Sequence, residues 1–288
     1  LTKRGAAVYC ILTRNALNFI TRKTMETLTG NPAVVDMFER PSQWEVEHIA
    51  LAKRADVFLV APASANFLGK VAAGVADDML TTTVLACKCP KLIAPAMNTN
   101  MYENPVTQDN LALLRRYGWE VIEPASGRLA CGAVGKGKLP EPEEILQYIL
   151  RQLAFPHDLA GKKVLVTAGP TQEAIDPVRY LTNHSTGKMG YAIARMAMLR
   201  GADVTLVSGP TAIAPPPFVT VVPVVSAQDM FEAVAANAPK SDFIFKAAAV
   251  ADYTPANYSD NKVKKSEGDM SIPLKRTRDI LKYLGENR

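Results

Sequence analysis

The feature that most constrains the fold of this 288-residue chain is a regular alternation of short β-branched runs with amphipathic stretches. Such alternation is typical of βαβ units that build a parallel sheet. In the first half, strands are predicted at four places: Val8–Thr13, Val57–Ala63, Lys91–Met97 and Glu120–Ala125. Helices are predicted between them, at Trp44–Arg54 and Pro105–Tyr117. The sequence therefore predicts an α/β fold.

The same pattern restarts after Pro156-His157-Asp158, which interrupts a helical stretch. The strands predicted for the second half are Lys163–Gly169, Asp203–Gly209, Thr220–Val225 and Asp242–Val250. A chain of this length suits two domains of about 150 residues each. We therefore predict two Rossmann-like domains with mainly parallel sheets, at residues 1–156 and 157–288.

Three predicted strands of the first half end in similar segments, "APASAN", "APAMN" and "EPASG". Turns at the carboxyl ends of parallel strands are where open α/β sheets bind ligands. Ser64 and Asn66 follow one strand, and Asn98 follows another. Ser and Asn are also favoured helix N-caps, so capping is an equally good explanation for the first pair. Two carboxamides at one edge favour a small planar ligand that carries a carboxylate or phosphate.

Composition excludes several function classes. The net charge is only +5 and the aromatic content 7%, so a nucleic-acid partner is not favoured. No apolar run approaches the ~18 residues of a membrane span. The Cys87-x-Cys89 step does not have zinc-knuckle spacing, and the cysteine usage fits a reducing compartment, which predicts a cytoplasmic protein.

The segment "TNHSTGKMG" contains a Gly-Lys pair like the end of a phosphate-binding P-loop. That motif needs a hydroxyl after the lysine and a glycine five residues before the second glycine. Met189 and Thr182 occupy those two places, so the motif is excluded. The segment belongs to a long loop, residues 167–190, that precedes a predicted helix, and helix N-termini bind anions. Loops this long inside a compact domain are usually functional.

Two further segments suit a nucleotide. "FKAAAVADY" ends a predicted strand in a run of alanines whose bare backbone admits a flat base, and Asp252 follows it. "DNKVKK" places three lysines within four residues, which usually marks a solvated surface but beside a nucleotide would neutralise phosphate. In the first half, His48 lies on a predicted helix, where a lone histidine is more often structural. Cys131 lies in a glycine-rich basic loop, where cations lower a thiol pKa.

"HIALAKRAD", "APASANFLGKVAAGVADD", "APAMNTNM" and "LACGAVGKGKL", in this order, resemble the FMN-dependent cysteine decarboxylases of coenzyme A synthesis. The second-half segments quoted above resemble the fused phosphopantothenate–cysteine ligase. The chain thus resembles the bacterial bifunctional phosphopantothenoylcysteine decarboxylase/phosphopantothenate–cysteine ligases. The resemblance implies a flavodoxin-like FMN-binding first domain and a nucleotide-binding second domain. It also implies that the family's proteins begin before Leu1 and continue beyond Arg288.

For the first domain, the resemblance implies that His48 is the base during decarboxylation, that Asn98 holds the substrate carboxylate and that Cys131 donates a proton in the final reduction. FMN carries the redox step. Contacts to FMN are implied for Thr13, Ser64 and Asn66.

For the second domain, the resemblance implies that CTP activates 4′-phosphopantothenate as an acyl-cytidylate, with Mg²⁺ on the triphosphate, and that cysteine displaces CMP. Asn183 is implied to stabilise this stage, and Lys262 to aid its formation. The implied CTP site is lined by Lys246, Ala247, Ala248, Asp252, Arg278, Asp279, Ile280 and Leu281. Some family members have Asn-Pro-Asp-Ile where this chain has Thr-Arg-Asp-Ile, so at Arg278 a backbone contact is the one that can be carried over.

Three alternative functions are less favoured. Relatives of the decarboxylase serve as regulatory phosphatase-binding subunits, but the fused ligase and the three catalytic residues argue against that role. A flavin prenyltransferase should lack the Cys131 loop and the second domain. A plain NAD(P)-dependent reductase would need a Gly-x-Gly-x-x-Gly run after its first strand, and none is present. The resemblance further implies a homo-oligomer, a trimer-based dodecamer whose ligase domains pair as dimers.

Overall fold

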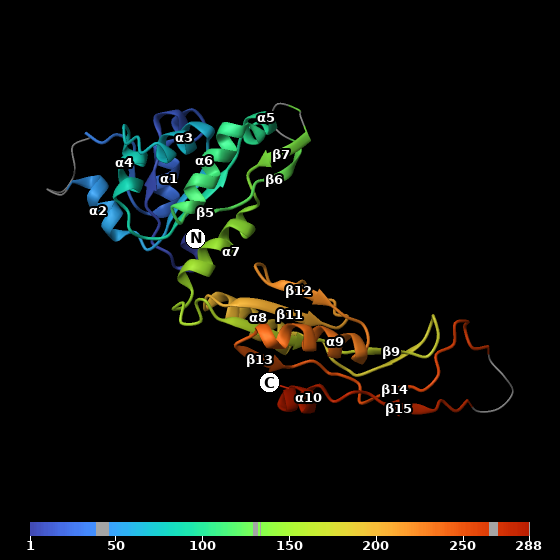
Figure 1. Ribbon diagram of the computed structural model, residues 1–288. Coiled ribbons are helices and arrows are strands. Elements are labelled where there is room, and N and C mark those ends of the chain that lie inside the picture. Colours follow the sequence, from blue (N-terminus) through green and yellow to red (C-terminus); the bar gives the residue numbers. More distant parts are fainter. Residues whose placement is uncertain (39–45, 129–131, 133, 265–269, 288) are drawn as a thin grey trace. The chain divides into compact units, whose positions relative to one another are not determined.

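The computed structural model describes residues 1–38, 46–128, 132, 134–264 and 270–287. The chain divides into two compact units, Leu1–Leu153 and Ala154–Arg288, and both are α/β (Figure 1). The predicted fold class, with mainly parallel sheets, is confirmed. No helix in the described part of the chain has the length and apolar character needed to cross a membrane.

The helices and strands of the first unit are η1 (Thr2–Arg4), β1 (Cys10–Ile11), η2 (Arg14–Asn18), α1 (Arg22–Thr29), β2 (Ala33–Val34), α2 (Glu47–Arg54), β3 (Phe58–Ala63), α3 (Ala65–Ala72), α4 (Met79–Ala86), β4 (Lys91–Pro95), α5 (Thr99–Glu103), α6 (Pro105–Arg116), β5 (Glu120–Val121), β6 (Ala125–Arg128), β7 (Val134–Lys138) and α7 (Pro142–Leu153). Strands β3, β4 and β5 form a parallel sheet in that order, and β1 pairs with β2 in parallel.

Both faces of the β3–β4–β5 sheet are covered. Ile93 of β4 packs in one cluster with residues of α3 and α6, whereas its neighbours Leu92 and Ala94 pack in another cluster with Ile145 and Ile149 of α7. Successive residues of a strand point to opposite faces, so the two clusters lie on opposite sides of β4. A parallel sheet buried on both faces needs such continuous apolar strands.

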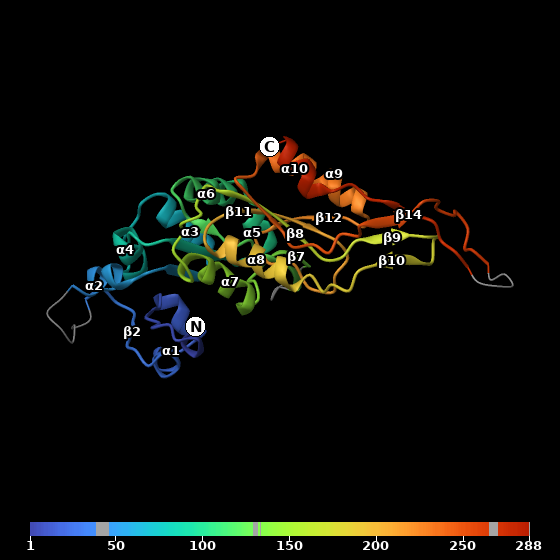
Figure 2. The same ribbon diagram turned by 90° about the horizontal axis from the view of Figure 1, so that it is seen from below.

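The elements of the second unit are β8 (Lys163–Ala168), β9 (Gln172–Ala174), β10 (Tyr180–Thr182), α8 (Lys188–Leu199), β11 (Asp203–Ser208), β12 (Thr220–Pro223), α9 (Ala227–Asn237), η3 (Ala238–Lys240), β13 (Phe243–Lys246), β14 (Tyr253–Pro255), β15 (Leu274–Arg276) and α10 (Ile280–Asn287). The main sheet has the order β12-β11-β8-β13 and is parallel throughout. The antiparallel pairs β9–β10 and β14–β15 lie next to each other (Figures 1 and 2).

Helices α8 and α9 cover opposite faces of this sheet. Leu165 and Val207 pack with residues of α9 and α10. Ala168, which has the opposite parity in β8, lies against α8, because a Cβ added at Gly190 would stand 2.5 Å from the Ala168 Cβ. Gly190 is therefore required for the close packing of this helix start against its strand. The second unit is thus doubly wound, as expected of a Rossmann-like domain.

Several predicted elements differ in extent from those observed. The first strand is only Cys10–Ile11, and the last strand of the main sheet ends at Lys246, so residues 247–250 are not strand. The loop at 167–190 contains the β9–β10 hairpin, and the glycine-rich segment contains β6–β7. These hairpins carry weak apolar patterns, because few of their side chains are buried. The predicted boundary between residues 156 and 157 stays a prediction.

Candidate functional site

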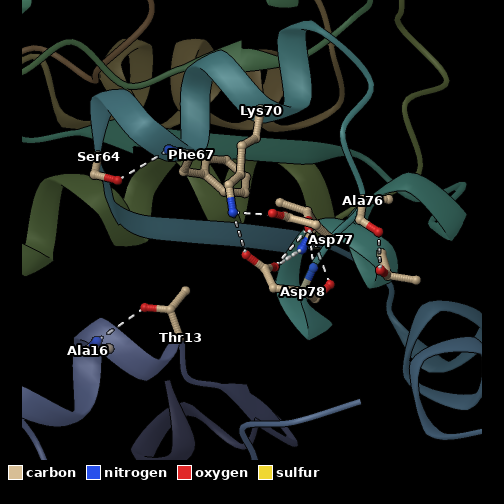
Figure 3. A network of polar contacts seen from close by, with 10 residues as sticks. Thr13, Ala16, Ser64, Phe67, Lys70, Ala76, Asp77 and Asp78 are labelled. Carbon is tan, nitrogen blue, oxygen red and sulfur yellow. Dashed lines mark hydrogen bonds and ion pairs between the residues drawn. The ribbon is translucent and has the colours of Figure 1, made fainter. Parts of the chain in front are cut away.

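In the first unit, the polar side chains predicted to bind FMN lie at the starts of short helices. Thr13 caps η2 by accepting a hydrogen bond from the Ala16 amide at 3.2 Å, and Ser64 caps α3 by accepting from the Phe67 amide, also at 3.2 Å. Figure 3 shows both caps together with a separate cluster in which Lys70 Nζ donates to the carboxylates of Asp77 and Asp78. Asn66 is exposed in the first turn of α3. The capping interpretation is therefore observed for Ser64, and the helix start beside it remains a suitable anion site.

Asn98 lies close to Ser64 because the ends of β3 and β4 are paired. Ala63 stands opposite Pro95, and the Ala96 amide donates to the Ala63 carbonyl at 3.1 Å. Asn98 caps α5, and its Oδ1 accepts from the Asn100 amide at 2.9 Å. The sheet thus places these two predicted ligand-binding residues at one carboxyl edge.

The β6–β7 hairpin is fixed to the same edge. The Met97 amide donates to the Gly137 carbonyl at 3.0 Å, and a Cβ at Gly137 would stand 2.2 Å from the Met97 carbonyl oxygen. Only glycine allows this approach, at a φ of 138°. Cys131, the predicted proton donor, falls between β6 and β7 in the sequence. It lies outside the described residues.

An ionic cluster holds β7 at this position. Glu123 accepts hydrogen bonds from Tyr102 at 2.9 Å, Lys136 at 3.1 Å and Arg115 at 2.5 Å. Burial raises the pKa of Glu123, but the hydrogen bonds from Lys136 and Tyr102 outweigh it, so the pKa lies below its ordinary value. The carboxylate therefore stays ionised at neutral pH and ties β7 to the sheet.

One polar group at this edge was missed by sequence reasoning. The Thr99 hydroxyl is buried and has no hydrogen-bond partner among the described residues. It follows Asn98 directly and lies beneath Gly135 of β7. A buried hydroxyl without a partner is uncommon in folded proteins, and this one is a further candidate contact for a ligand at this edge. Together with the neutral hydroxyls and amides nearby, it is a donor set that fits a flavin mononucleotide. His48 is half-buried in the first turn of α2, which packs on α4, and its role as the base stays a prediction.

In the second unit, Asn183 joins two segments that the sequence assigned to one site. Its Nδ2 donates to the carbonyls of Ala249 and Val250, at 3.4 and 3.2 Å. Asn183 follows β10, and the two carbonyls belong to the alanine run after β13. The contact therefore places the loop before α8 beside the alanine run.

Three threonines also hold the alanine run, and sequence reasoning missed them. Thr167, fully buried, accepts from the amides of Ala247 and Ala248 at 3.1 and 3.2 Å. Thr171 accepts from the Ala251 amide at 3.0 Å, and Thr277 donates to the Ala251 carbonyl at 2.7 Å. All these bonds go to main-chain atoms, so the alanine side chains are left to face other neighbours.

A cavity of about 630 Å³ opens at the start of α8, and its lining includes Ser185, Lys188 and Ala247. Gly187 caps the helix at a φ of 76°. The hydroxyls of Ser185 and Thr186, the Lys188 ammonium and the N-terminus of the 12-residue helix α8 form a donor set suited to phosphate. Among the described residues, no group of three or more His, Cys, Asp or Glu is placed to hold a metal ion.

The remaining predicted residues surround the ends of β13 and β15. Burial lowers the pKa of Lys246, and the Asp279 charge partly opposes that shift. Asp279 caps α10, Ile280 is buried in the core, and Leu281 is exposed. The Arg278 guanidinium lies 4.7 Å from the centre of the Phe231 ring. Because Ile280 packs in the core, a nucleotide contact there falls to its main chain.

Two residues complete the predicted set. Asp252 is exposed, and its carbonyl accepts from the Thr277 amide at 2.9 Å. Lys262 is exposed on the segment that follows β14, and the structure joins this segment to the turn between β9 and β10.

Residues 1–154 match the Flavoprotein family model, and residues 159–288 match the model of the DNA/pantothenate metabolism flavoprotein C-terminal domain. The Coenzyme A biosynthesis bifunctional protein CoaBC of Bacillus subtilis is 48% identical over 291 residues, which cover all of this chain and 72% of the relative. CoaBC of Mycobacterium bovis is 50% identical over 288 residues, which cover 98% of this chain and 68% of the relative. The chain belongs to the CoaBC family.

Two solved structures each resemble one half of the chain. The C-terminal domain of a CoaBC protein is 55% identical, with a TM-score of 0.40. The match covers 45% of this chain and 61% of the chain in that structure. A PPC decarboxylase mutant is 34% identical, with a TM-score of 0.44, and covers 51% of this chain and 83% of its own.

Membership of the CoaBC family makes the chain a bifunctional enzyme of coenzyme A biosynthesis, with phosphopantothenoylcysteine decarboxylase and phosphopantothenate–cysteine ligase activities. FMN is the cofactor of the flavoprotein half. The match over the whole chain does not favour a regulatory subunit or a flavin prenyltransferase.

Proposed function

We propose that the second unit binds CTP at the carboxyl edge of its parallel sheet, with the triphosphate at the start of α8 and the base against the alanine run. The observation that carries this proposal is the bond from Asn183 to the Ala249 and Val250 carbonyls, which brings the two segments to one place. Ser185 and Lys188, in the adjoining cavity, are suited to the phosphates.

In the reaction we propose, the carboxylate of 4′-phosphopantothenate attacks the α-phosphorus of CTP and displaces pyrophosphate. The cysteine amine then attacks the acyl carbon, loses a proton and displaces CMP. Mg²⁺ would arrive with the triphosphate, since this ion is commonly held by one or two carboxylates together with phosphates. Lys262 would neutralise phosphate charge during the first displacement.

Asn183 has a defined part in the second displacement. Its Nδ2 donates to the two main-chain carbonyls, which leaves Oδ1 as an acceptor. An acceptor at this place suits the N–H groups of the attacking amine. The main chain of the alanine run thereby fixes which way the Asn183 carboxamide faces.

For the first unit, we propose that FMN binds at the carboxyl edge of β3 and β4, where Ser64 and Asn66 lie at the start of α3, with Thr13 at the start of η2 as a further contact. FMN, when bound, supplies the reversible oxidation that lets the cysteine-derived carboxylate leave as CO₂. Asn98 would hold that carboxylate, and His48 would carry a proton. The proton-donor role of Cys131 stays a prediction.

The test uses the full-length protein with 4′-phosphopantothenate, cysteine, CTP and Mg²⁺, followed by mass spectrometry. We expect phosphopantetheine with all components and phosphopantothenoylcysteine after removal of FMN. Omission of CTP should leave 4′-phosphopantothenate unchanged. Product formed equally well without CTP would contradict the nucleotide proposal.

The assembly and compartment follow the same proposal. A homo-oligomer built from decarboxylase trimers and ligase dimers, in the cytoplasm, is the arrangement that the resemblance predicts. Light scattering of the full-length protein distinguishes a dodecamer from a smaller assembly.

A further inference from the structure

Asp176 is a buried carboxylate that none of the roles above uses. It lies in the turn between β9 and β10, and its side chain is 0% exposed. Burial of a carboxylate is costly unless partners compensate for its lost hydration. The partners of this enclosed carboxylate therefore show what the turn holds in place.

The two oxygens of Asp176 accept five hydrogen bonds. Oδ1 accepts from the amides of Val178 and Arg179, at 2.8 and 2.9 Å. Oδ2 accepts from Arg179 Nε at 3.0 Å, from Arg179 Nη2 at 2.5 Å and from the Val263 amide at 3.1 Å. The Arg179 guanidinium and the backbone amides hold the pKa of Asp176 well below its usual range, so it is ionised at neutral pH.

The Asp176–Arg179 pair grips both backbone groups of one distant residue. Asp176 accepts from the Val263 amide, and Arg179 Nη2 donates to the Val263 carbonyl at 2.9 Å. The Ser259 amide donates to the Ile175 carbonyl at 3.1 Å. The main chain on both sides of Lys262 is thus attached to the β9–β10 turn.

The same hairpin carries Asn183 at its other end. Strand β10, Tyr180–Thr182, runs directly from Arg179 to Asn183. A short hydrogen-bonded hairpin therefore joins the grip on the Lys262 segment to the residue that contacts the alanine run.

We propose that Asp176 is a positioning residue of the ligase half: with Arg179, it holds the main chain at Val263 so that Lys262 is presented to the nucleotide from a fixed place. The inference rests on the proposed role of Lys262. A lysine stem is flexible, and fixing its root removes much of the conformational freedom that would otherwise be lost on binding.

The first test is Asp176→Asn in the full-length protein. A carboxamide has one acceptor oxygen, so it cannot serve donors on both sides. We expect CTP-dependent pyrophosphate release to fall about tenfold in kcat/KM, the size of a lost charge-assisted bond, while decarboxylation is unchanged. The matched control is Asp158→Asn, which removes the exposed partner of Arg200 and should leave both activities unchanged. An unaltered Asp176→Asn enzyme would overturn the proposal.

A double-mutant cycle separates positioning from a general loss of stability. If Asp176 acts through Lys262, then Asp176→Asn should cost less than about twofold in a Lys262→Ala background, because coupled residues are not additive. A full tenfold loss in that background would overturn the positioning role. A Lys262→Ala enzyme with normal kinetics would instead refute the proposed role of Lys262, on which the inference rests.

Arg179→Lys covers the case in which Asp176→Asn does not fold. It keeps the charge that Asp176 needs but loses the forked contact to the Val263 carbonyl. We expect the same coupling to Lys262→Ala, with a smaller loss of kcat/KM, and an independent effect would count against the proposal.

Discussion

The two carboxyl edges use their polar side chains in opposite ways. In the first unit, Thr13, Ser64 and Asn98 accept hydrogen bonds from amides two or three residues along the chain. In the second unit, Asn183 and Thr167 bond to main-chain groups 66 to 81 residues away. These bonds of the first edge each stay within one helix start, whereas those of the second edge join segments that lie far apart in the chain. Substitutions should have local effects at the first edge and cooperative effects at the second.

The largest effect is expected for Asn183→Asp, which tests the second edge. A carboxylate cannot donate to the Ala249 and Val250 carbonyls, and its charge would repel them. We expect ligase turnover to fall on the order of 100-fold or more, as when a transition-state hydrogen bond is lost. Decarboxylation of phosphopantothenoylcysteine, measured by CO₂ release, should be retained.

The control for this change is Asn237→Asp. The Asn237 carboxamide also donates to a carbonyl, that of Ala233, but at the end of α9. If both variants lose ligase activity equally, the effect is one of stability and the comparison fails.

Gly137→Ala tests the long-range contact of the first unit. The new Cβ would meet the Met97 carbonyl oxygen at 2.2 Å, at a φ that favours glycine. We expect a loss of about 3 kcal/mol in unfolding free energy, at the upper end of overpacking costs, and a matching loss of decarboxylase activity. Thermal unfolding measures the first effect.

The same hairpin offers a matched control in Gly127→Ala. Its added Cβ would find only the flexible Lys138 side chain, at 3.7 Å. If both variants are destabilised equally, the hairpin tolerates no added side chain at either position. The contact to Met97 would then not explain the effect of Gly137→Ala.

Thr167→Val should have an intermediate effect. The isosteric change leaves the part-buried Ala248 amide without its acceptor, which costs about 1 kcal/mol. We expect a lower thermal midpoint and a higher KM for CTP, measured by pyrophosphate release. Thr205→Val in the neighbouring strand is the control, since the Thr205 hydroxyl bonds to no described residue. A rise in KM for both variants would argue against a specific role.

The smallest effect is expected for Ser64→Ala. Loss of a helix N-cap costs about 1 kcal/mol, which corresponds to a shift of a few degrees in the thermal midpoint. FMN affinity, followed by flavin fluorescence, should weaken slightly if the α3 start binds the cofactor. Ser226→Ala removes a similar cap from α9, so it should lower stability without changing FMN affinity.

The strands with regular apolar patterns could be predicted from the sequence. The short hairpins and the contacts between residues far apart in the chain could not. The strands β3, β4, β8 and β11 were predicted because buried parallel strands are continuous apolar runs. The hairpins β9–β10 and β14–β15 were missed, because short strands with exposed residues carry no clear period. Strand-end residues such as Ser64 and Asn98 could be placed together from topology alone.

The partners of the alanine run could not be found in the same way. Thr167 reads as an ordinary strand residue, and its acceptor role exists only because β13 pairs beside β8. Asp176 and Arg179 have the three-residue spacing of a local ion pair, which gave a signal, but the grip on Val263 spans 87 residues from Asp176. A single sequence without aligned relatives does not reveal such a pairing.

The hydrogen bonds to the alanine run determine which substitutions this segment can tolerate. Asn183, Thr167, Thr171 and Thr277 all bond to main-chain atoms of the run. These bonds therefore depend on the backbone conformation of the run and not on its side chains. A change of Ala249 to serine or glycine would keep every one of these bonds, whereas a bulky residue would fill the space beside them. Mutational tolerance should therefore follow side-chain size within the run and chemical identity among its four partners.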